Sequence, residues 1–416
     1  MAKCCGNKNN EPVKSGDPCD PPQPKCASEN TGSQEPTNGP LYWFGNMIQN
    51  CYEYATDAKS KGKHIVGIMC EYTPRELIMA ADGVPVCLCG GSDEMIPPAE
   101  EDLPANLCPL IKSTYGYHIK KANPFLEMAE LIVAETTCDG KKKMYELMGQ
   151  IRQMHILELP QKPDDEDAMS HWISQLRNFR AKMEKAFGVK ITDEKIKHAI
   201  QIMNKERRLR RELAELMKSQ RPSLTGRQLL DFKSIISGIE ADFFQYEKAI
   251  ELYKNGNKCS CNNSPVRVLL TGVPVVHGAE RVFDIIESSG GLVVCMDNCT
   301  GLKPILEDVD ENTDDPIIAL AEKYFHLPCS VMTKNDRRME MLSDLVSEYK
   351  PDCIVELIWQ ACITYDVESY LVKKLAEEQL GIPYLRIETD YSPSDSARIA
   401  LRMEALFETV RERSRN

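Results

Sequence analysis

Short apolar runs alternate with segments of helical periodicity in the first third of the chain. The runs at 64–70 and 84–91 are closed by turn residues, and the segment 73–82 between them has the start and stop signals of a helix. A further apolar run begins the segment 131–140, LIVAETTCDG, and a helical pattern follows it. Strands and helices that alternate over short links predict a doubly wound parallel sheet over residues 41–140.

The middle of the chain has a different pattern. Residues 141–257 are long, charged and periodic, with apolar positions at steps of three and four and almost no strand signal. This pattern predicts a helical domain, either a cap or a bundle.

The alternating pattern returns in the last part of the chain. Four apolar runs are separated by helical segments, and an amphipathic helix ends the sequence; the runs lie at 266–276, 291–301, 351–362 and 381–390. The expected fold is therefore α/β, with two doubly wound parallel-sheet (flavodoxin-like) domains related by internal pseudo-symmetry, plus a helical segment. The expected organisation is a flexible N-terminal arm at 1–40, a first α/β domain at 41–140, a helical domain at 141–257 and a second α/β domain with a C-terminal helix at 258–416.

Composition removes several classes of function. The net charge of −12 argues against a nucleic-acid surface, and no apolar run is long enough for a membrane span. The first residues, MAKCCGNKNN, lack the apolar core of a signal peptide, so a cytoplasmic protein is expected.

The content of 17 cysteines is unusual for such a chain. In a reducing compartment, cysteines serve as metal ligands or redox groups more often than as disulfides. Six occupy matching positions in the two α/β units, at strand ends or before a helix: Cys70, Cys108, Cys138, Cys299, Cys329 and Cys362. The carboxyl edge of a parallel sheet is where such proteins bind ligands, so we expect one set of three thiols per sheet.

The other cysteines have weaker claims. Cys89, which precedes two glycines, competes with Cys70 for the third place in the first set. Core packing is the simpler interpretation for Cys51, Cys87, Cys295 and Cys353. The spacing of the N-terminal cysteines matches no zinc module: Cys4, Cys5, Cys19 and Cys26. Cys259 and Cys261 lie in a polar loop, where a metal role is a minor alternative.

Several polar residues near the candidate ligands could donate protons or hydrogen bonds: Glu71, His118, Asp139, Asp297, Asn298, His326 and Tyr365. Structural zinc takes four ligands, whereas three thiolates on a four-iron cubane leave one iron open to chemistry.

The cysteine-bearing segments resemble the benzoyl-CoA reductase and 2-hydroxyacyl-CoA dehydratase (2-hydroxyglutaryl-CoA dehydratase D-component) family. The matching pieces are CEYTPRELIMAADGVPV, the LCP at Cys108, ETTCDGKKK, MDNCTG and GIPYLRIETDYS. Two sets of three cysteines in one chain are most similar to the double-cubane cluster proteins of this family.

That resemblance implies two 4Fe–4S cubanes bridged by sulfide, an 8Fe–9S iron–sulfur cluster. One cubane is expected on Cys70, Cys108 and Cys138, and the other on Cys299, Cys329 and Cys362. It also implies a homodimer that reduces a small-molecule substrate, with electrons from a separate ATP-hydrolysing iron–sulfur activator. The sequence agrees in having no G-x-x-x-x-G-K-[ST] phosphate loop of its own. Two alternatives remain, namely a 2-hydroxyacyl-CoA dehydratase component with one 4Fe–4S cluster and a non-catalytic electron-storage protein.

Overall fold

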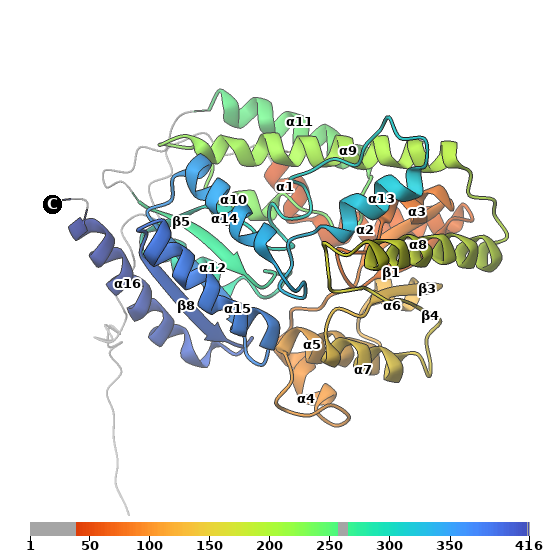
Figure 1. Cartoon of the computed structure of the whole chain (residues 1–416), viewed down its shortest axis with the longest axis horizontal. Coiled ribbons are helices and arrows are strands. Elements are labelled where there is room, and N and C mark those ends of the chain that lie inside the picture. Colours follow the sequence, from red (N-terminus) through yellow and green to blue (C-terminus); the bar gives the residue numbers. More distant parts are fainter. Residues whose placement is uncertain (1–38, 257–264, 414, 416) are drawn as a thin grey trace, which may run out of the picture. The chain divides into compact units, whose positions relative to one another are not determined.

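Two four-stranded parallel sheets organise the chain in the computed structural model, which describes residues 39–256, 265–413 and 415 (Figure 1). The first sheet has the order β2-β1-β3-β4 and the second has the order β6-β5-β7-β8. The strands of the first are β1 (His64–Ile68), β2 (Gly83–Cys87), β3 (Leu131–Glu135) and β4 (Met154–Leu157). Those of the second are β5 (Val266–Gly272), β6 (Gly291–Met296), β7 (Cys353–Trp359) and β8 (Tyr384–Thr389).

The same strand order in both sheets confirms the predicted α/β class and the internal pseudo-symmetry. In each sheet the first strand along the chain pairs in parallel with the second and the third, and the fourth adds to the third. The inner strands are apolar runs buried throughout, as expected for sheets covered by helices on both faces. The more specific likeness to flavodoxin stays a prediction.

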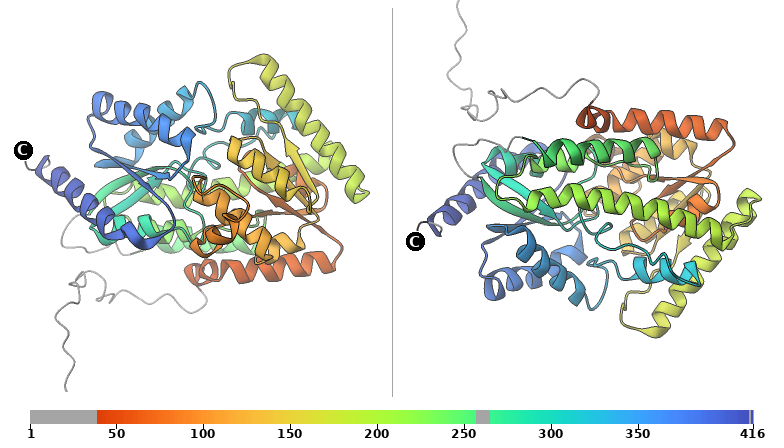
Figure 2. Two further views of the ribbon diagram at one scale, coloured as in Figure 1. Left: turned by 90° about the horizontal axis from the view of Figure 1, so that it is seen from below. Right: turned by 90° about the horizontal axis from the view of Figure 1, so that it is seen from above.

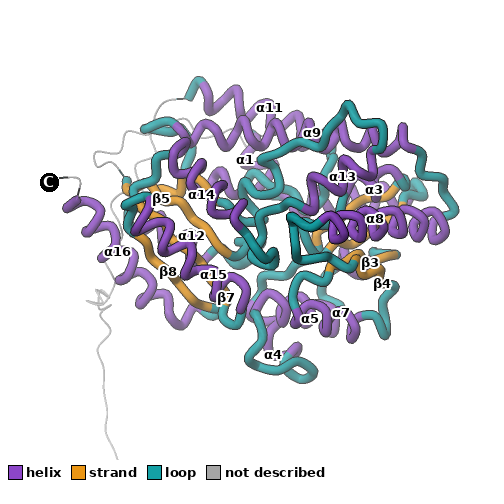
Figure 3. Tube along the Cα trace, viewed as in Figure 1, coloured by secondary structure: helices purple, strands orange, loops and turns teal. Residues whose placement is uncertain are grey.

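Helices fill the connections between strands (Figure 3). Those before residue 150 are α1 (Pro40–Gly45), α2 (Met47–Ser60), α3 (Arg75–Ala80), α4 (Ile96–Ala99), α5 (Pro109–Lys120), α6 (Pro124–Met128) and α7 (Asp139–Met148). Those after residue 265 are α12 (Arg281–Ser288), α13 (Pro316–Phe325), α14 (Asp336–Tyr349), α15 (Ile363–Lys374) and α16 (Ser396–Arg413). Short turns of other helical types are η1 (Asp93–Met95), η2 (Leu216–Lys218), η3 (Leu375–Gln379) and η4 (Pro393–Asp395).

The middle of the chain is helical, as its periodicity predicts. Its helices are α8 (Glu166–Phe187), α9 (Asp193–Glu215), α10 (Gly226–Asp231) and α11 (Glu240–Lys254). Figure 2 shows α9 and α11 side by side, and α9 also packs against α3. Strand β4 lies in this range and was not expected, because its four residues form a half-exposed edge strand with little apolar pattern. The predicted domain limits themselves stay a prediction.

Helix α13 of the second α/β unit packs in the core of the first. Helix α13, which follows β6 along the chain, places Ile317, Leu320 and Phe325 in the same buried core as Val66 and Ile68 of β1. Because α13 belongs by sequence to the second unit and β1 to the first, this core joins the two halves.

A second buried core contains residues of both sheets. Ile111 of α5 and Met144 of α7 belong to the same buried cluster as Leu270, Val355 and Trp359 of the second sheet. Among the described residues, no helix is long and apolar enough to cross a membrane.

Candidate metal centre

The six candidate cysteines lie where strands end or helices begin. Cys70 and Cys299 follow β1 and β6 within a few residues, and Cys329 lies in the loop between α13 and α14. The other three are the residues immediately before α5, α7 and α15, in the order Cys108, Cys138 and Cys362. All six are buried or half-buried.

Cys108, Cys138 and Cys362 form one group of neighbours, called here the Cys108 group. A hydrogen bond with Cys362 is the largest influence on Cys108 and lowers the pKa of its thiol, against the effect of burial. The same bond, together with burial, raises the pKa of Cys362 well above its ordinary value. Cys138 interacts electrostatically with Cys362, and burial is the main reason that its pKa is raised. The two thiols share one hydrogen bond, so they titrate as a pair.

Each sulfur of the Cys108 group receives backbone N–H groups from the helix that it begins. The N–H groups of Leu110 and Ile111 donate to Cys108, those of Gly140 and Lys141 to Cys138, and that of Tyr365 to Cys362. These donors are free at a helix N-terminus, and the helix dipole there favours negative charge. Three helices therefore stabilise thiolates at one place.

Cys70, Cys299 and Cys329 form the second group, called here the Cys70 group. Burial raises the pKa of Cys70 well above its ordinary value, and electrostatic repulsion from Cys299 and Cys329 raises it further. Burial likewise raises the pKa of Cys299 to about 12, with Cys329 again a contributor. The three thiols are mutual neighbours, and metal binding to Cys70 and Cys299 would have to displace the protons that burial holds on them.

The grouping corrects the expectation of one set per sheet. Each group takes thiols from both α/β units, because the buried cores around the two groups each contain residues of both units. The loop after α13 carries Cys329 to the end of β1, where the Tyr72 hydroxyl donates to the carbonyl of Leu327 at 3.2 Å. Helices α5 and α7 belong to a buried cluster that contains residues of both sheets, and the cysteines at their starts, Cys108 and Cys138, are neighbours of Cys362.

Cys89 lies near both groups but is held differently from Cys70. Its thiol donates to the carbonyl of Met69 at 3.3 Å, and burial raises its pKa. Cys89 and Cys108 both act on the pKa of Tyr391, which burial raises. By contrast, Cys70 has two other candidate cysteines, Cys299 and Cys329, among its electrostatic neighbours.

Lys141 lies between the two groups and was missed by sequence reasoning. Its ammonium donates to the carbonyl of Met69 at 3.0 Å. Burial opposes its charge, but Cys70 of one group and Cys138 of the other, together with Cys89, leave its pKa raised well above normal. In the sequence it is one of three consecutive lysines, so no pattern separates it from its exposed neighbours.

A buried carboxyl lies beside Lys141, also unanticipated. Glu135, at the end of β3, is fully buried, and burial raises its pKa to about 8. Thr73 donates a hydrogen bond to its Oε1, while its Oε2 and the hydroxyl of Tyr145 are buried with no partner. Since buried polar atoms are nearly always hydrogen-bonded, these two atoms point to a bound group or water beside the thiols.

A second lysine serves the Cys70 group. The ammonium of Lys303 donates to the hydroxyl of Tyr365 at 2.7 Å, and the whole side chain is buried. Burial opposes the charge of Lys303, but Cys299 and Cys329 leave its pKa raised. Tyr365 was a candidate from the sequence, and it also lies in the field of Cys329 and Cys299, although burial is the main reason that its pKa is raised.

The other polar candidates have structural partners. Asn298 donates to the carbonyl of Val273 at 3.1 Å, and Asp297 pairs with the fully buried Arg338 at 3.2 Å. His326 contacts the carbonyl of Glu322 at 2.8 Å. The rest contact charged neighbours, namely Glu71 with Arg75, His118 with Arg152 and Asp139 with Lys142.

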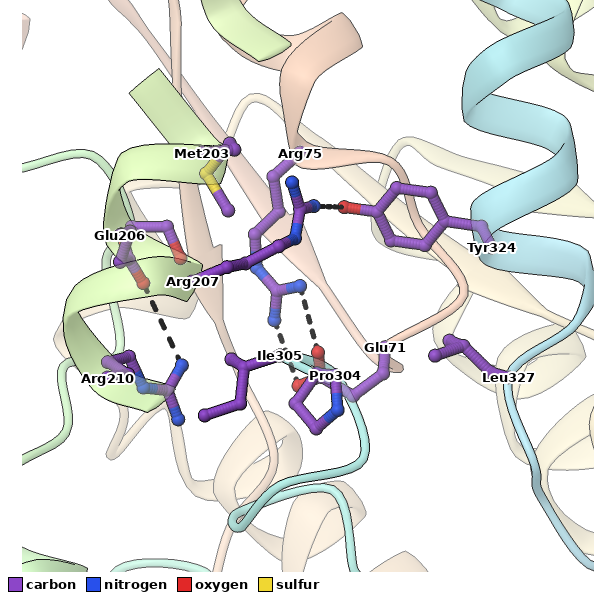
Figure 4. Close-up of a pocket in the computed structure, with 11 residues that line it drawn as sticks. Glu71, Arg75, Met203, Glu206, Arg207, Arg210, Pro304, Ile305, Tyr324 and Leu327 are labelled. Carbon is purple, nitrogen blue, oxygen red and sulfur yellow. Dashed lines mark hydrogen bonds and ion pairs between the residues drawn. The ribbon is translucent and has the colours of Figure 1, made fainter. Parts of the chain in front are cut away.

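A small cavity of about 20 Å³ lies next to the Cys70 group (Figure 4). Glu71, which follows Cys70, pairs there with Arg75 at 2.9 Å, and the Arg207 guanidinium donates to the Tyr324 hydroxyl at 3.0 Å. A cavity of this size holds about one water molecule, so it is no substrate pocket.

The remaining cysteines fall into two classes. Cys295 and Cys353 are buried within strands and Cys51 within α2, and burial raises the pKa of each. Cys87 accepts a weak hydrogen bond from Arg75 at 3.5 Å, and burial raises its pKa to about 11. Six further cysteines lie outside the described residues, namely Cys4, Cys5, Cys19, Cys26, Cys259 and Cys261.

The donor set fits an iron–sulfur cofactor. Thiolates are its usual protein ligands, and the neighbouring lysines Lys141 and Lys303 would offset their negative charge. In the described part of the chain, no three Cys, His, Asp or Glu side chains are placed to share one metal ion. A cubane differs from such a site because each of its cysteines binds a separate iron atom. It therefore requires three neighbouring thiols and not three that converge on one ion.

Comparison with known proteins agrees with this picture. The family model described as 2-hydroxyglutaryl-CoA dehydratase, D-component, matches residues 70–410. The chain is 38% identical over 377 residues to the putative dehydratase subunit YjiM of Escherichia coli K12, covering 88% of this chain and 97% of that protein. It is 23% identical over 375 residues to the (R)-phenyllactyl-CoA dehydratase beta subunit of Clostridium sporogenes, covering 88% of this chain and 97% of that protein.

A reductase is also represented among the relatives. One of the subunits of benzoyl-CoA reductase from Thauera aromatica is 22% identical over 290 residues, covering 67% of this chain and 72% of that protein. The chain therefore belongs to the 2-hydroxyglutaryl-CoA dehydratase D-component family, which includes subunits of dehydratases and reductases.

Proposed function

We propose that this protein is a low-potential reductase whose six cysteines hold a double-cubane iron–sulfur cluster. The observation that supports this most strongly is the presence of two groups of three thiols within one chain. A subunit with one cubane on three cysteines would use only one of them. Cys108, Cys138 and Cys362 would hold one cubane, and Cys70, Cys299 and Cys329 the other, with Cys70 preferred to Cys89.

The surrounding residues have distinct tasks in this proposal. Lys141 would offset the charge of both cubanes, and Lys303 that of the cubane on the Cys70 group, because each ammonium lies among the thiols concerned. Backbone N–H groups at the starts of α5, α7 and α15 would hydrogen-bond the other three sulfurs. When bound, the cluster supplies stored electrons at low potential. Glu135, which keeps its proton up to about pH 8, would supply a proton to a substrate reduced beside it.

The electrons would come from a separate ATP-hydrolysing iron–sulfur activator, as in related enzymes that depend on an activator component. The substrate class would be small unsaturated molecules, and the protein would act in the cytoplasm as a homodimer. It would contact neither nucleic acid nor membrane.

A second candidate is a 2-hydroxyacyl-CoA dehydratase component with a single 4Fe–4S cluster. The name of one relative favours it, since the Clostridium sporogenes protein is a subunit of a dehydratase that acts on a CoA thioester. In that case the open iron would bind the thioester carbonyl, and one of the two thiol groups would have no cluster. A non-catalytic electron-storage protein is the third candidate, and it would turn over no substrate.

Turnover assays separate the three candidates. The anaerobically purified protein is supplied with a low-potential one-electron donor and offered either small alkynes and nitriles or a 2-hydroxyacyl-CoA thioester. Reduction of the small molecules supports the reductase, and Glu135→Gln should slow it at least tenfold while the iron content stays the same. Dehydration of the thioester with no reduction would favour the second candidate, and reversible cluster reduction with no product the third.

A further inference from the structure

Helix α15 carries an apolar stripe on its solvent side. Ile363, Val367, Tyr370 and Leu371 are exposed by 66%, 71%, 70% and 49%. Their spacing of four, three and one places them on one side of the helix, opposite the buried Val372. Single exposed apolar residues are common, but four together on one short helix indicate a surface that is normally covered.

The internal repeat shows that the stripe is not needed to build this helix. Helix α7 is the counterpart of α15, because it follows β3 as α15 follows β7, and both begin after a candidate cysteine. At the positions of Ile363, Val367 and Tyr370, α7 has Asp139, Lys143 and Glu146, whose side chains are 95%, 74% and 64% exposed. At these three positions the same helix is thus polar in one unit and apolar in the other, whereas Leu371 has an apolar counterpart, the half-buried Leu147.

We propose that the stripe on α15 is the surface through which two copies of this chain associate, with the two helices packed antiparallel across a twofold axis near Tyr370. This interface is that of the homodimer in the proposed function, on which the inference rests. The residues that form it lie on α15 and are none of the candidate metal ligands. A permanent interface fits better than a transient one, because obligate interfaces are the more apolar class.

The charges at the ends of the stripe are self-complementary. Asp366, which also pairs with Arg386, flanks the stripe four residues before Tyr370, and the exposed Lys374 continues it four residues after. In an antiparallel pair that crosses at Tyr370, Asp366 of each copy lies opposite Lys374 of the other. A twofold interface requires this kind of reciprocity, since each contact occurs twice. A different protein would have no reason to match this spacing.

The arrangement has a consequence for the metal centre. Cys362 is the residue immediately before α15, so pairing of the two helices would bring the Cys108 group of each copy next to the interface. The Cys70 group of each chain has no ligand on α15.

The test is the oligomeric state of the holoprotein, measured by sedimentation equilibrium under anaerobic conditions. The wild-type chain should have the mass of two copies. A variant with Val367→Lys and Tyr370→Glu, which installs the residues found in α7, should have the mass of one copy. The control is Leu401→Lys on α16, which alters another exposed apolar residue (68%) and should remain dimeric.

A charge exchange tests the antiparallel geometry. Lys374→Glu should weaken association roughly tenfold by opposing Asp366 of the partner, and adding Asp366→Lys should restore it. The iron content and the thermal unfolding midpoint are measured on the same samples, so that loss of the dimer is distinguished from loss of the fold or of the cofactor. A monomeric wild-type chain, or a dimer that survives the double change in α15, would overturn the proposal, as would recovery of the monomer with a different protein bound to this face.

Discussion

At the scale of single residues, the site combines thiols that need help to ionise with cationic groups that provide it. Burial raises the pKa of Cys70, Cys138 and Cys299, because a thiolate is poorly solvated inside the protein. Lys141 and Lys303 have the opposite sign of charge and are placed among these thiols. The chemistry of the centre should therefore respond to changes in single neighbouring side chains.

Glu135 should make the stability of the apoprotein depend on pH. Its folded-state pKa of about 8 lies above the ordinary value of 4.5, so the folded chain holds this proton more tightly than the unfolded chain. The resulting stabilisation is fully present below about pH 4.5 and is lost as the pH rises through 8. Relative to Glu135→Gln, the wild-type apoprotein should lose up to about 1.4 kcal/mol of unfolding free energy per pH unit in that range. Urea titrations at several pH values measure this, and parallel curves for the two proteins would contradict it.

Removal of the Lys141 charge should make the cofactor harder to reduce. In the holoprotein, Lys141→Met takes away a cation that lies near Cys70 and Cys138, so adding an electron becomes less favourable. The potential should fall by on the order of 50 mV, the equivalent of about 1 kcal/mol for one electron. Lys142→Met is the matched control, because Lys142 is half-exposed and pairs with Asp139 at the surface. Equal potentials in the two variants, measured by anaerobic spectroelectrochemistry, would show that Lys141 has no such role.

At the scale of elements, the site depends on where strands end and on how closely their loops approach. Three helices begin at candidate cysteines, and the loops after β2 and β5 meet where Gly91 faces His277. A Cβ atom at Gly91 would lie 2.4 Å from the carbonyl oxygen of His277. The contact therefore requires glycine on one side, and it joins the first α/β unit to the second.

Gly91→Ala should weaken this junction. Its added methyl group must displace backbone rather than a flexible side chain, so the free energy of unfolding should fall by about 1–3 kcal/mol. The iron content should also fall, because both thiol groups depend on how the units meet. Gly45→Ala is the control, since nothing lies within 4 Å of a Cβ atom at that position. Chemical denaturation and iron analysis of both variants test this, and equal values for the two would refute it.

Sequence reasoning located these elements where the pattern was strong. The run predicted at 64–70 is a strand over 64–68, and 131–135 is a strand. The periodic segments of the middle region are helices, because burial on one face gives a regular spacing of apolar residues. Strand β4 was missed because a short edge strand buries little. Glu135 and Lys141 were missed for a different reason: each lies in a segment noted for its cysteine, and only the fold shows that these two side chains point inward.

At the scale of the whole molecule, two α/β units with the same strand order are joined, and each thiol group contains cysteines of both units. Sequence symmetry predicted two groups of three, but it placed each group on its own sheet. The repeat shows which positions are equivalent and says nothing about how the two units face one another. The packing of α13 in the core of the first unit, and the shared core in which α5 and α7 meet the second sheet, decide the grouping.

The cross-unit grouping can be tested with the cluster signals. Cys108→Ser and Cys362→Ser are changes in different units, yet they should alter the same iron signal in Mössbauer and electron paramagnetic resonance spectra. Cys299→Ser should alter a different signal, although it shares a unit with Cys362. Cys353→Ser is the control, because Cys353 is the buried first residue of β7, at the other end of the strand from Cys362. If Cys299→Ser and Cys362→Ser altered the same signal, each cubane would be held by the cysteines of a single α/β unit, which would contradict the cross-unit grouping.

The measurement that tests the central claim most directly is the iron and acid-labile sulfide content of the anaerobically purified chain. Two bridged cubanes on six thiolates predict about eight irons and about nine sulfides per chain. About four irons would contradict the double cluster and support a single cubane, and the absence of iron would contradict the metal centre altogether.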